Sequence, residues 1–217
     1  MTTQRYFLEC LNPLCGFRFP LDLSTLEGRI CPRCGAELQK ITPQIEQWQP
    51  KWNSNAATLF IGVLDNIRSA HNVGSIFRTS EAASVVHLYL CGLTPSPRSN
   101  SALSKAALGA EERVAWSEHT NAVQVVTLLK SEGCQIIALE CTPQAENLFA
   151  PREVHNPPGK VALVVGNEPA GVDPEILALA DQTLYIPMAG QKTSLNVSVA
   201  YGVAVYGLLS SWSAFSA

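Results

Sequence analysis

The sequence predicts an α/β protein, a parallel sheet with helices on both faces, preceded by a small zinc ribbon. Two observations predict this fold class. From Thr58 onward, short apolar runs alternate with segments of helical periodicity, which is typical of parallel sheets covered on both faces. Ahead of them, four cysteines gather between Cys10 and Cys34. With 217 residues, 47% of them hydrophobic, the chain is long enough for one full core and a small appended module.

The four cysteines define a first module, predicted over residues 1–42. They follow the pattern C-x4-C-x15-C-x2-C, formed by Cys10, Cys15, Cys31 and Cys34. Two cysteine pairs at this spacing suit a tetrahedral thiolate site, so we predict a structural zinc ion that folds the module. Gly16 and Gly35 follow the pairs and permit positive φ, which lets backbone N–H groups point at the sulfurs. Two disulfides are the alternative interpretation.

A linker is predicted over residues 43–57, which mix Pro, Gln, Asn and Trp without a sustained period, with Trp48 and Trp52 packing it onto a neighbour. Residues 58–217 form the main domain. The strands expected there are Leu59–Leu64, Val86–Leu90, Gln135–Leu139, Val161–Val165 and Thr183–Ile186. The expected helices are Val73–Ala83, Ala102–Leu108, Ala122–Ser131, Pro174–Ala180 and Ser194–Ser210. The remaining cysteines are interpreted as small core residues, namely Cys91, Cys134 and Cys141.

Ligands of such sheets bind beyond the carboxyl ends of the strands, so polar loops there are expected to carry the chemistry. The first of these loops is "DNIRSAHNVGSIFRTSEAA". Asn72 is expected to cap the helix that follows, because its side chain can accept the unpaired N–H groups of a first turn. That role alone would explain the residue. Arg78 either faces the loops or is an ordinary surface arginine.

Two further loops carry polar side chains. In "VVGNEPAGVDPE", Gly166 and Gly171 allow the backbone to turn sharply, and Pro169 holds Glu168 extended at the end of a strand. A solvated loop acid is the alternative interpretation of this glutamate. In the last loop, Ser194 is expected to cap an apolar and therefore buried helix. Capping needs only that serine, so the asparagine at position 196 stays unexplained by helix formation.

Several function classes are excluded or disfavoured. Glycines separated by a single residue are absent from the sequence, and so is G-K-[ST], which excludes the usual dinucleotide and P-loop motifs. The net charge of −3 argues against a generic polyanion binder, because phosphate neutralisation supplies most non-specific affinity for nucleic acids. Neither a membrane-length apolar run nor a signal-peptide pattern is visible, so we expect a cytoplasmic protein without a membrane partner.

Three segments, taken in order, resemble the motifs of the SpoU/TrmH family of RNA ribose 2′-O-methyltransferases in the SPOUT superfamily. They are "HNVGSIFRTSEA", "LVVGNEPAGV" and "LYIPMAGQKTSLNVSVAYGV". The likeness covers about Thr58 to Trp212. It implies a trefoil knot formed around Gln135–Ser198, a homodimer, and S-adenosylmethionine-dependent methylation of a ribose 2′-hydroxyl in tRNA or rRNA.

The resemblance also implies roles for individual residues. It assigns the polar catalytic centre to Asn72, Arg78, Glu168, Ser194 and Asn196. It assigns the cofactor pocket to Leu139, Glu140, Cys141, Gly166, Asn167, Glu168, Gly171, Ile186, Met188, Ser194, Leu195 and Asn196. Arg78 is the candidate for assisting loss of the hydroxyl proton. Because a guanidinium normally stays protonated, we favour a phosphate clamp that stabilises the developing alkoxide over a free base.

The cysteine module is not a general feature of the family. It is interpreted either as an RNA-holding element, through Arg18, Arg29 and Arg33, or as a stabilising cap on the main domain. Two other functions stay open. One is a dimeric RNA-binding protein that keeps the knot without catalysis, which the complete set of five polar residues disfavours. The other is a base methyltransferase of the same superfamily, which the asparagine and arginine of the first motif disfavour.

Overall fold

A computed structural model describes residues 5–23, 30–45, 58–151 and 159–212. The chain divides into two compact units, Met1–Trp52 and Asn53–Ala217, and each is described by itself. Most of the predicted linker, including Trp48 and Trp52, lies outside the described residues. None of the helices in the described ranges combines the length and apolarity needed to cross a membrane.

The first unit is a three-stranded antiparallel sheet of order β2-β1-β3. Its strands are β1 (Arg5–Cys10), β2 (Arg18–Asp22) and β3 (Leu38–Pro43). The buried apolar side chains in the described part of this unit are those of Leu8, Cys10 and Cys31, and two of the three are cysteines. So small a core does not by itself stabilise a domain, and the module needs a further source of stability.

The second unit is built on a seven-stranded sheet of order β6-β5-β4-β9-β7-β10-β8, in which every pairing is parallel. The strands are β4 (Leu59–Asp65), β5 (His87–Cys91), β6 (Ala115–His119), β7 (Gln135–Leu139), β8 (Glu146–Asn147), β9 (Lys160–Val165) and β10 (Gln182–Tyr185). The central strands β4 and β9 are almost completely buried, as expected for a sheet covered on both sides.

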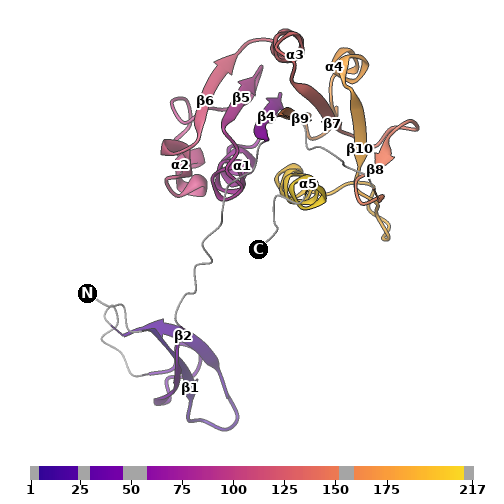
Figure 1. Cartoon of the computed structure of the whole chain (residues 1–217). Helices are drawn as coiled ribbons and strands as arrows, with labels where there is room; N and C mark the ends of the chain where they lie inside the picture. The colour runs from indigo at the N-terminus through magenta and orange to yellow at the C-terminus, as the bar shows by residue number, and fades with distance from the viewer. Residues whose placement is uncertain (1–4, 24–29, 46–57, 152–158, 213–217) are drawn as a thin grey trace. The chain divides into compact units, whose positions relative to one another are not determined.

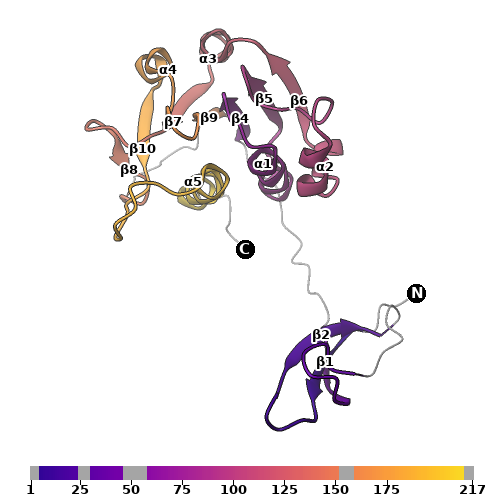
Figure 2. The same cartoon turned by 180° about the vertical axis from the view of Figure 1, so that it is seen from behind.

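Helices cover both faces of this sheet, which confirms the predicted fold class (Figures 1 and 2). The five helices described are α1 (Ala70–Ala82), α2 (Ser101–Ala107), α3 (Ala122–Ser131), α4 (Pro174–Leu179) and α5 (Val197–Ser211). Buried side chains of α1, α2 and α5 share one hydrophobic cluster with one face of the sheet. Those of α3 and α4 share a second cluster with the other face. The alternation of strand side chains therefore supplies two cores.

Strand β4 and helix α5 approach each other closely at Gly62. A Cβ atom there would lie 2.8 Å from the hydroxyl oxygen of Tyr201, a fully buried side chain of α5. That hydroxyl shares a 2.9 Å hydrogen bond with Ser80 of α1, so the polar end of the tyrosine is satisfied inside the core. The contact fixes α5 against α1 and the sheet.

Some boundaries differ from the prediction. Strand β7 and helix α3 coincide with the predicted ranges. Strand β6 and the two-residue strand β8 were not predicted, and neither was the 3₁₀ turn at Ala110–Glu112. Strand β6 is an edge strand of partly exposed residues, and β8 is too short to show a period. Helix α1 begins three residues before its predicted start, and α5 begins three residues after its predicted start. Both differences result from hydrogen bonds at the functional site.

Candidate functional site

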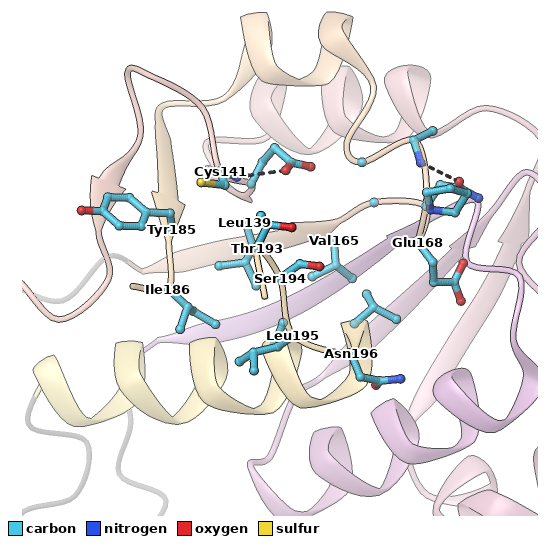
Figure 3. A pocket seen from close by; sticks show the side chains of 18 of the residues that line it. Leu139, Cys141, Val165, Glu168, Tyr185, Ile186, Thr193, Ser194, Leu195 and Asn196 are labelled. Atoms are coloured by element: carbon cyan, nitrogen blue, oxygen red, sulfur yellow. Dashed lines mark hydrogen bonds between the residues drawn. The ribbon is translucent and has the colours of Figure 1, made fainter. Parts of the chain in front are cut away.

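A cavity of about 690 Å³ lies at the carboxyl ends of β7, β9 and β10. The loops after these three strands and the start of α5 form its walls (Figure 3). Figure 3 shows Glu168 and Asn196 at one end of the cavity and Tyr185 and Ile186 at the other. The lining combines apolar side chains with polar loop groups, as is typical of pockets for small molecules and cofactors.

The loops after β7 and β9 are joined by one carboxylate. Glu140 accepts a 2.9 Å hydrogen bond from the Cys141 N–H and another of 2.9 Å from the Val172 N–H. Its side chain lies where a Cβ atom at Gly171 would be, and Gly171 has a φ of +77°. A Cβ atom at Gly166 would in turn clash with the backbone of Gly171. Both glycines are therefore required by the close approach of protein atoms, and the positive φ of Gly171 fits the predicted sharp turn.

At the opposite end of the cavity, three side chains form a continuous chain of hydrogen bonds. The Asn196 amide nitrogen donates to the Asn72 amide oxygen at 3.0 Å, and the Asn72 amide nitrogen donates to Glu168 at 3.0 Å. Glu168 also accepts the backbone N–H groups of Arg68, at 3.0 Å, and Ser69, at 3.2 Å. The chain links the start of α5, the first turn of α1 and the loop after β9.

The chemistry of the two ends fixes both amide orientations. A carboxylate only accepts hydrogen bonds, so Asn72 must turn its nitrogen to Glu168 and its oxygen to Asn196. Asn196 must then present its nitrogen to Asn72, and its oxygen accepts the N–H groups of Ser198 and Val199 at the start of α5. The Glu168 carboxylate at one end and the N–H groups of α5 at the other end therefore require the same orientation of both amides.

The predicted helix caps are wrong. Ser69, not Asn72, caps α1 by accepting the Asn72 N–H at 3.3 Å. Asn196, not Ser194, caps α5, which begins at Val197. Asn72 is drawn into the polar chain by Glu168, leaving the cap to the serine three residues before it. The unexplained asparagine at position 196 thus has two roles, as a cap and as a donor to Asn72.

Burial of the Glu168 carboxyl acts to raise its pKa, but hydrogen bonds from the Arg68, Asn72 and Ser69 N–H groups outweigh it and lower the pKa. Because the folded pKa lies below the ordinary value, these bonds stabilise the protein above that value and lose their effect as the pH falls through the folded pKa.

We therefore expect Glu168→Gln to lower the free energy of unfolding at about pH 7 by about 1 kcal/mol, after allowance for solvent exposure. Glutamine has one acceptor oxygen for three donors. The difference from the unaltered protein, measured by denaturant unfolding, should shrink as the pH falls below the ordinary pKa of a glutamate. Glu146→Gln, the same charge change on exposed β8, is the control. A difference independent of pH would contradict this role of the carboxylate.

A family model, the SpoU rRNA Methylase family, matches residues 59–206. The chain belongs to the SpoU rRNA methylase family. The residues that match the family model include all those that line the cavity and none of the cysteine module. Relatives include the tRNA (guanosine(18)-2′-O)-methyltransferase of Aquifex aeolicus, 37% identical over 65% of this chain and 64% of the relative. The 23S rRNA (guanosine-2′-O-)-methyltransferase RlmB of Salmonella typhi is 32% identical over 68% of this chain and 58% of the relative.

The chain thus spans about three fifths of the length of these curated SpoU relatives. Among solved structures, the A. aeolicus TrmH/SpoU tRNA modifying enzyme superposes with a TM-score of 0.61 at 34% identity. That alignment covers 70% of this chain and 74% of the other. The family predicted from the three sequence motifs is confirmed.

All twelve residues that the SpoU resemblance assigns to a cofactor line the cavity. Cys141 is among them and is exposed, so its interpretation as a core residue is wrong, whereas Cys91 and Cys134 are buried. Sequence reasoning missed seven residues of the lining, namely Val165, Pro169, Ala170, Tyr185, Thr193, Val197 and Ala200. It also missed the N–H groups that bind Glu168, since backbone donors leave no trace in a sequence.

Two of the five polar residues implied for SpoU catalysis stand apart from the hydrogen-bonded chain. Ser194 lines the cavity. Arg78 is exposed on α1 and makes no hydrogen bond or ion pair within the described ranges. Six residues of α-helix place it about 9 Å along the axis from Asn72 and on a different face. The predicted role of Arg78, as a clamp for an RNA phosphate, therefore does not depend on this hydrogen-bonded chain.

The cysteine cluster lies outside the SpoU match. The four sulfur atoms of the predicted ligands lie within 4.8 Å of one another, with Cys10 to Cys34 at 3.4 Å and Cys15 to Cys31 at 3.9 Å. Sulfurs at the corners of a zinc tetrahedron with bonds of about 2.3 Å are about 3.8 Å apart. A hydrogen bond from the Ala36 N–H and the neighbouring Cys10 thiol lower the pKa of Cys34 to about 7, which favours a thiolate. The cluster is compatible with a metal site.

Proposed function

We propose that this chain transfers a methyl group from S-adenosylmethionine to a ribose 2′-hydroxyl of tRNA or rRNA. The hydrogen-bonded chain of Asn196, Asn72 and Glu168, at one end of a cofactor-sized cavity, is the observation that supports this most strongly. It places oriented amides beside a pocket, where a substrate hydroxyl would meet a bound donor. Two relatives of the chain are named as 2′-O-methyltransferases of tRNA and rRNA.

The cavity fits the methyl donor in size and in chemistry. At about 690 Å³ it is within the range of pockets that enclose ligands of this size. Leu139, Ile186 and Leu195 supply apolar surface for an adenine ring, and loop backbone groups around Gly166 supply polar contacts. An rRNA methyltransferase from Sinorhizobium meliloti with bound AdoMet shares the fold, with a TM-score of 0.63 at 23% identity. That likeness concerns the fold alone, so donor binding is proposed from the cavity.

S-adenosylmethionine, when bound, supplies an activated sulfonium methyl group. The protein must align the ribose hydroxyl with it and stabilise the oxygen as its proton leaves. Asn72 and Asn196 are held in fixed orientations and can position the hydroxyl, while Glu168 keeps both in place. Arg78 supplies a positive charge for an RNA phosphate and the developing alkoxide, because a guanidinium stays protonated.

We also propose a homodimer. Helix α5 presents apolar side chains to solvent, with Val199 51%, Tyr206 43% and the preceding Leu195 36% exposed. Val199 and Tyr206 are seven residues apart within α5, so they share one face of the helix. A second copy covering this face would bring new groups to the exposed Arg78 of the neighbouring helix α1. Light scattering of the full chain tests the assembly.

Three further assignments stay proposals. The cysteine cluster is proposed to hold zinc, and thiols kept free to do so fit a reducing compartment such as the cytoplasm. The module is proposed to hold RNA, although Arg18 also pairs with Glu9 and Arg29 lies outside the described residues. The knot is supported by the course of the chain, since β9 lies between β4 and β7 while β10 pairs on the far side of β7.

Methyl transfer is tested with radiolabelled S-adenosylmethionine and separate tRNA and rRNA fractions, followed by mass spectrometry of the nucleosides. A 2′-O-methylated nucleoside in one fraction is the expected result. Donor binding measured by calorimetry, together with RNA binding but no transfer, would favour the non-catalytic RNA-binding alternative. Methylation of a base would favour the base methyltransferase alternative.

Gly166→Ala is expected to weaken donor binding by at least about tenfold, because the added Cβ collides with the backbone of Gly171 and must displace the loop after β9. Gly159→Ala is the matched control, since its Cβ meets nothing within 4 Å at the start of the same strand. Calorimetric titration with the demethylated product compares them. Equal affinities in the two variants would show that this loop does not shape the donor site.

A further inference from the structure

We propose that Arg68 is an RNA-binding residue, whose guanidinium contacts a phosphate of the substrate beside the end of the cavity where the polar chain lies. The inference rests on the proposed function and deepens it by naming a substrate contact. Arg68 is exposed, and it lies in the segment between β4 and α1. Glu168, which lines the cavity, binds its backbone N–H at 3.0 Å.

The backbone that carries Arg68 is fixed at four successive residues. The N–H of Asn66 donates to the Cys91 carbonyl at 3.1 Å, and that of Ile67 to the Thr94 hydroxyl at 3.0 Å. The N–H groups of Arg68 and Ser69 both donate to Glu168. The side chain of Ile67, which belongs to this segment, is completely buried. A segment anchored in this way gives the Arg68 side chain a defined starting point.

Asn66 adds a second anchor. It has a left-handed backbone with a φ of +57°, and its carbonyl accepts the Asn167 amide at 2.7 Å. Its side-chain oxygen accepts the Leu93 N–H at 3.0 Å. The segment before α1 is therefore tied to the loop after β9, which forms the cavity wall. Arg68 and the cavity belong to one rigid arrangement of loops.

The Arg68 guanidinium has no such ties. It makes no hydrogen bond or ion pair with any residue in the described parts of the chain, although Glu168 binds the backbone N–H of the same residue. Glu168 has its oxygens occupied by Arg68, Ser69 and Asn72 donors. A positive charge left unpaired on a rigid loop beside a substrate site is suited to an anion, and the planar guanidinium matches the oxygens of a phosphate.

The substrate of the proposed reaction offers that anion. A ribose whose 2′-hydroxyl is methylated is flanked by phosphates on both sides of its own sugar, so a phosphate contact near Glu168 would set the position of the sugar. Such contacts fix register along an RNA without reading its sequence. Arg68 would thus contribute to substrate affinity while making no contact with the methyl donor.

The test compares Arg68→Ala, Arg68→Lys and Lys105→Ala in the full chain. Lys105 is an exposed cation on α2 and controls for the loss of one charge. Steady-state transfer to the RNA fraction that the unaltered protein methylates is measured together with filter binding of the same RNA at several salt concentrations. Donor affinity is measured by calorimetry in every variant.

For Arg68→Ala we expect KM for RNA to rise about tenfold with kcat within about twofold, and the salt dependence of binding to fall by about one released counterion. Arg68→Lys should recover part of the loss, and donor affinity should not change. An Arg68→Ala variant that behaves like Lys105→Ala would overturn this inference alone. An unaltered protein that binds no donor and methylates no RNA would overturn the proposed function, and the inference with it.

Discussion

An Asn196→Ala variant is expected to lose methyl transfer by about two orders of magnitude, as is typical when an oriented polar group is removed from an active site. The side chain has two roles that the substitution removes together. Its oxygen caps α5 through the N–H groups of Ser198 and Val199, and its nitrogen donates to Asn72. The loss of the cap alone costs about 1 kcal/mol of stability.

Asn196→Asp separates the two roles. A carboxylate still accepts the N–H groups at the start of α5, and its charge interacts favourably with the helix dipole, so the fold should be kept. It has no N–H to donate to Asn72, whose amide oxygen would then face a second acceptor. We expect this variant to be more stable than the alanine variant, because the cap is kept, and nearly as inactive.

Asn121→Ala supplies the matched control for cap loss, because Asn121 caps α3 through the Gln124 N–H at 3.2 Å on the opposite face of the sheet. Methyl transfer at saturating donor and RNA is measured for all three variants, with thermal unfolding beside it. Normal activity in the aspartate variant would show that donation to Asn72 has no part in the reaction, and that Asn196 is only a cap.

The sequence reveals the sheet and its helices because their signals are local. Helix α3 shows the full set, with Asn121 as its cap and an apolar stripe that faces one core, and its predicted range coincides with the observed one. Strand β7 is an uninterrupted apolar run after its first residue, Gln135. Strand β6 has neither signal, since it lies at the edge of the sheet with mixed exposure, and its pairing with β5 depends on the whole fold.

The start of α1 shows where local reasoning fails. Ser69 and Asn72 are both good caps, and the sequence between them does not say which one is used. Glu168, 96 residues further along the chain, decides it by binding the Asn72 amide. At the start of α5, a bond that spans 124 residues turns the Asn196 nitrogen toward Asn72 and leaves the Asn196 oxygen to cap the helix. The family resemblance predicted Asn72, Glu168 and Asn196 as polar site residues, whereas the hydrogen bonds between them depend on tertiary structure.

Cys141 fails for a related reason. An isolated cysteine after an apolar strand is most often a core residue, and Cys91 and Cys134 fit that expectation. Cys141 lies two residues after the end of β7, where the chain leaves the carboxyl edge of the sheet and forms the cavity wall. The position of the edge decides its exposure, and that position follows from the register of β7 against β9 and β10.

Removing the proposed zinc ion is expected to unfold the first unit and leave the second folded. Purified protein should contain about one zinc ion per chain, and Cys31→Ser should contain almost none. The binding energy of a structural zinc ion, about 10 kcal/mol, is folding energy for a small domain. The described part of this unit buries little apolar surface apart from Leu8 and its own cysteines, so packing does not replace that energy.

Cys134→Ala is the matched control, since Cys134 is a buried cysteine of the second unit and lies outside the cluster. Zinc content is measured by mass spectrometry, and folding of the two units by limited proteolysis with and without a chelator. A metal-free first unit that resists protease would contradict the zinc assignment. Full zinc content in Cys31→Ser would contradict the proposed ligand set.

Cys31→Ser also separates the two proposed roles of the module, because the cavity and the polar chain both lie in the second unit. An RNA-holding module predicts that Cys31→Ser raises KM for RNA while donor affinity and the thermal stability of the second unit stay unchanged. A stabilising cap predicts the reverse, a lower unfolding temperature with an unchanged KM at a temperature where the protein is still folded. Residues 53–217 carry nine Lys and Arg residues against 13 Asp and Glu residues, which gives them little non-specific affinity for RNA, so we expect the first result.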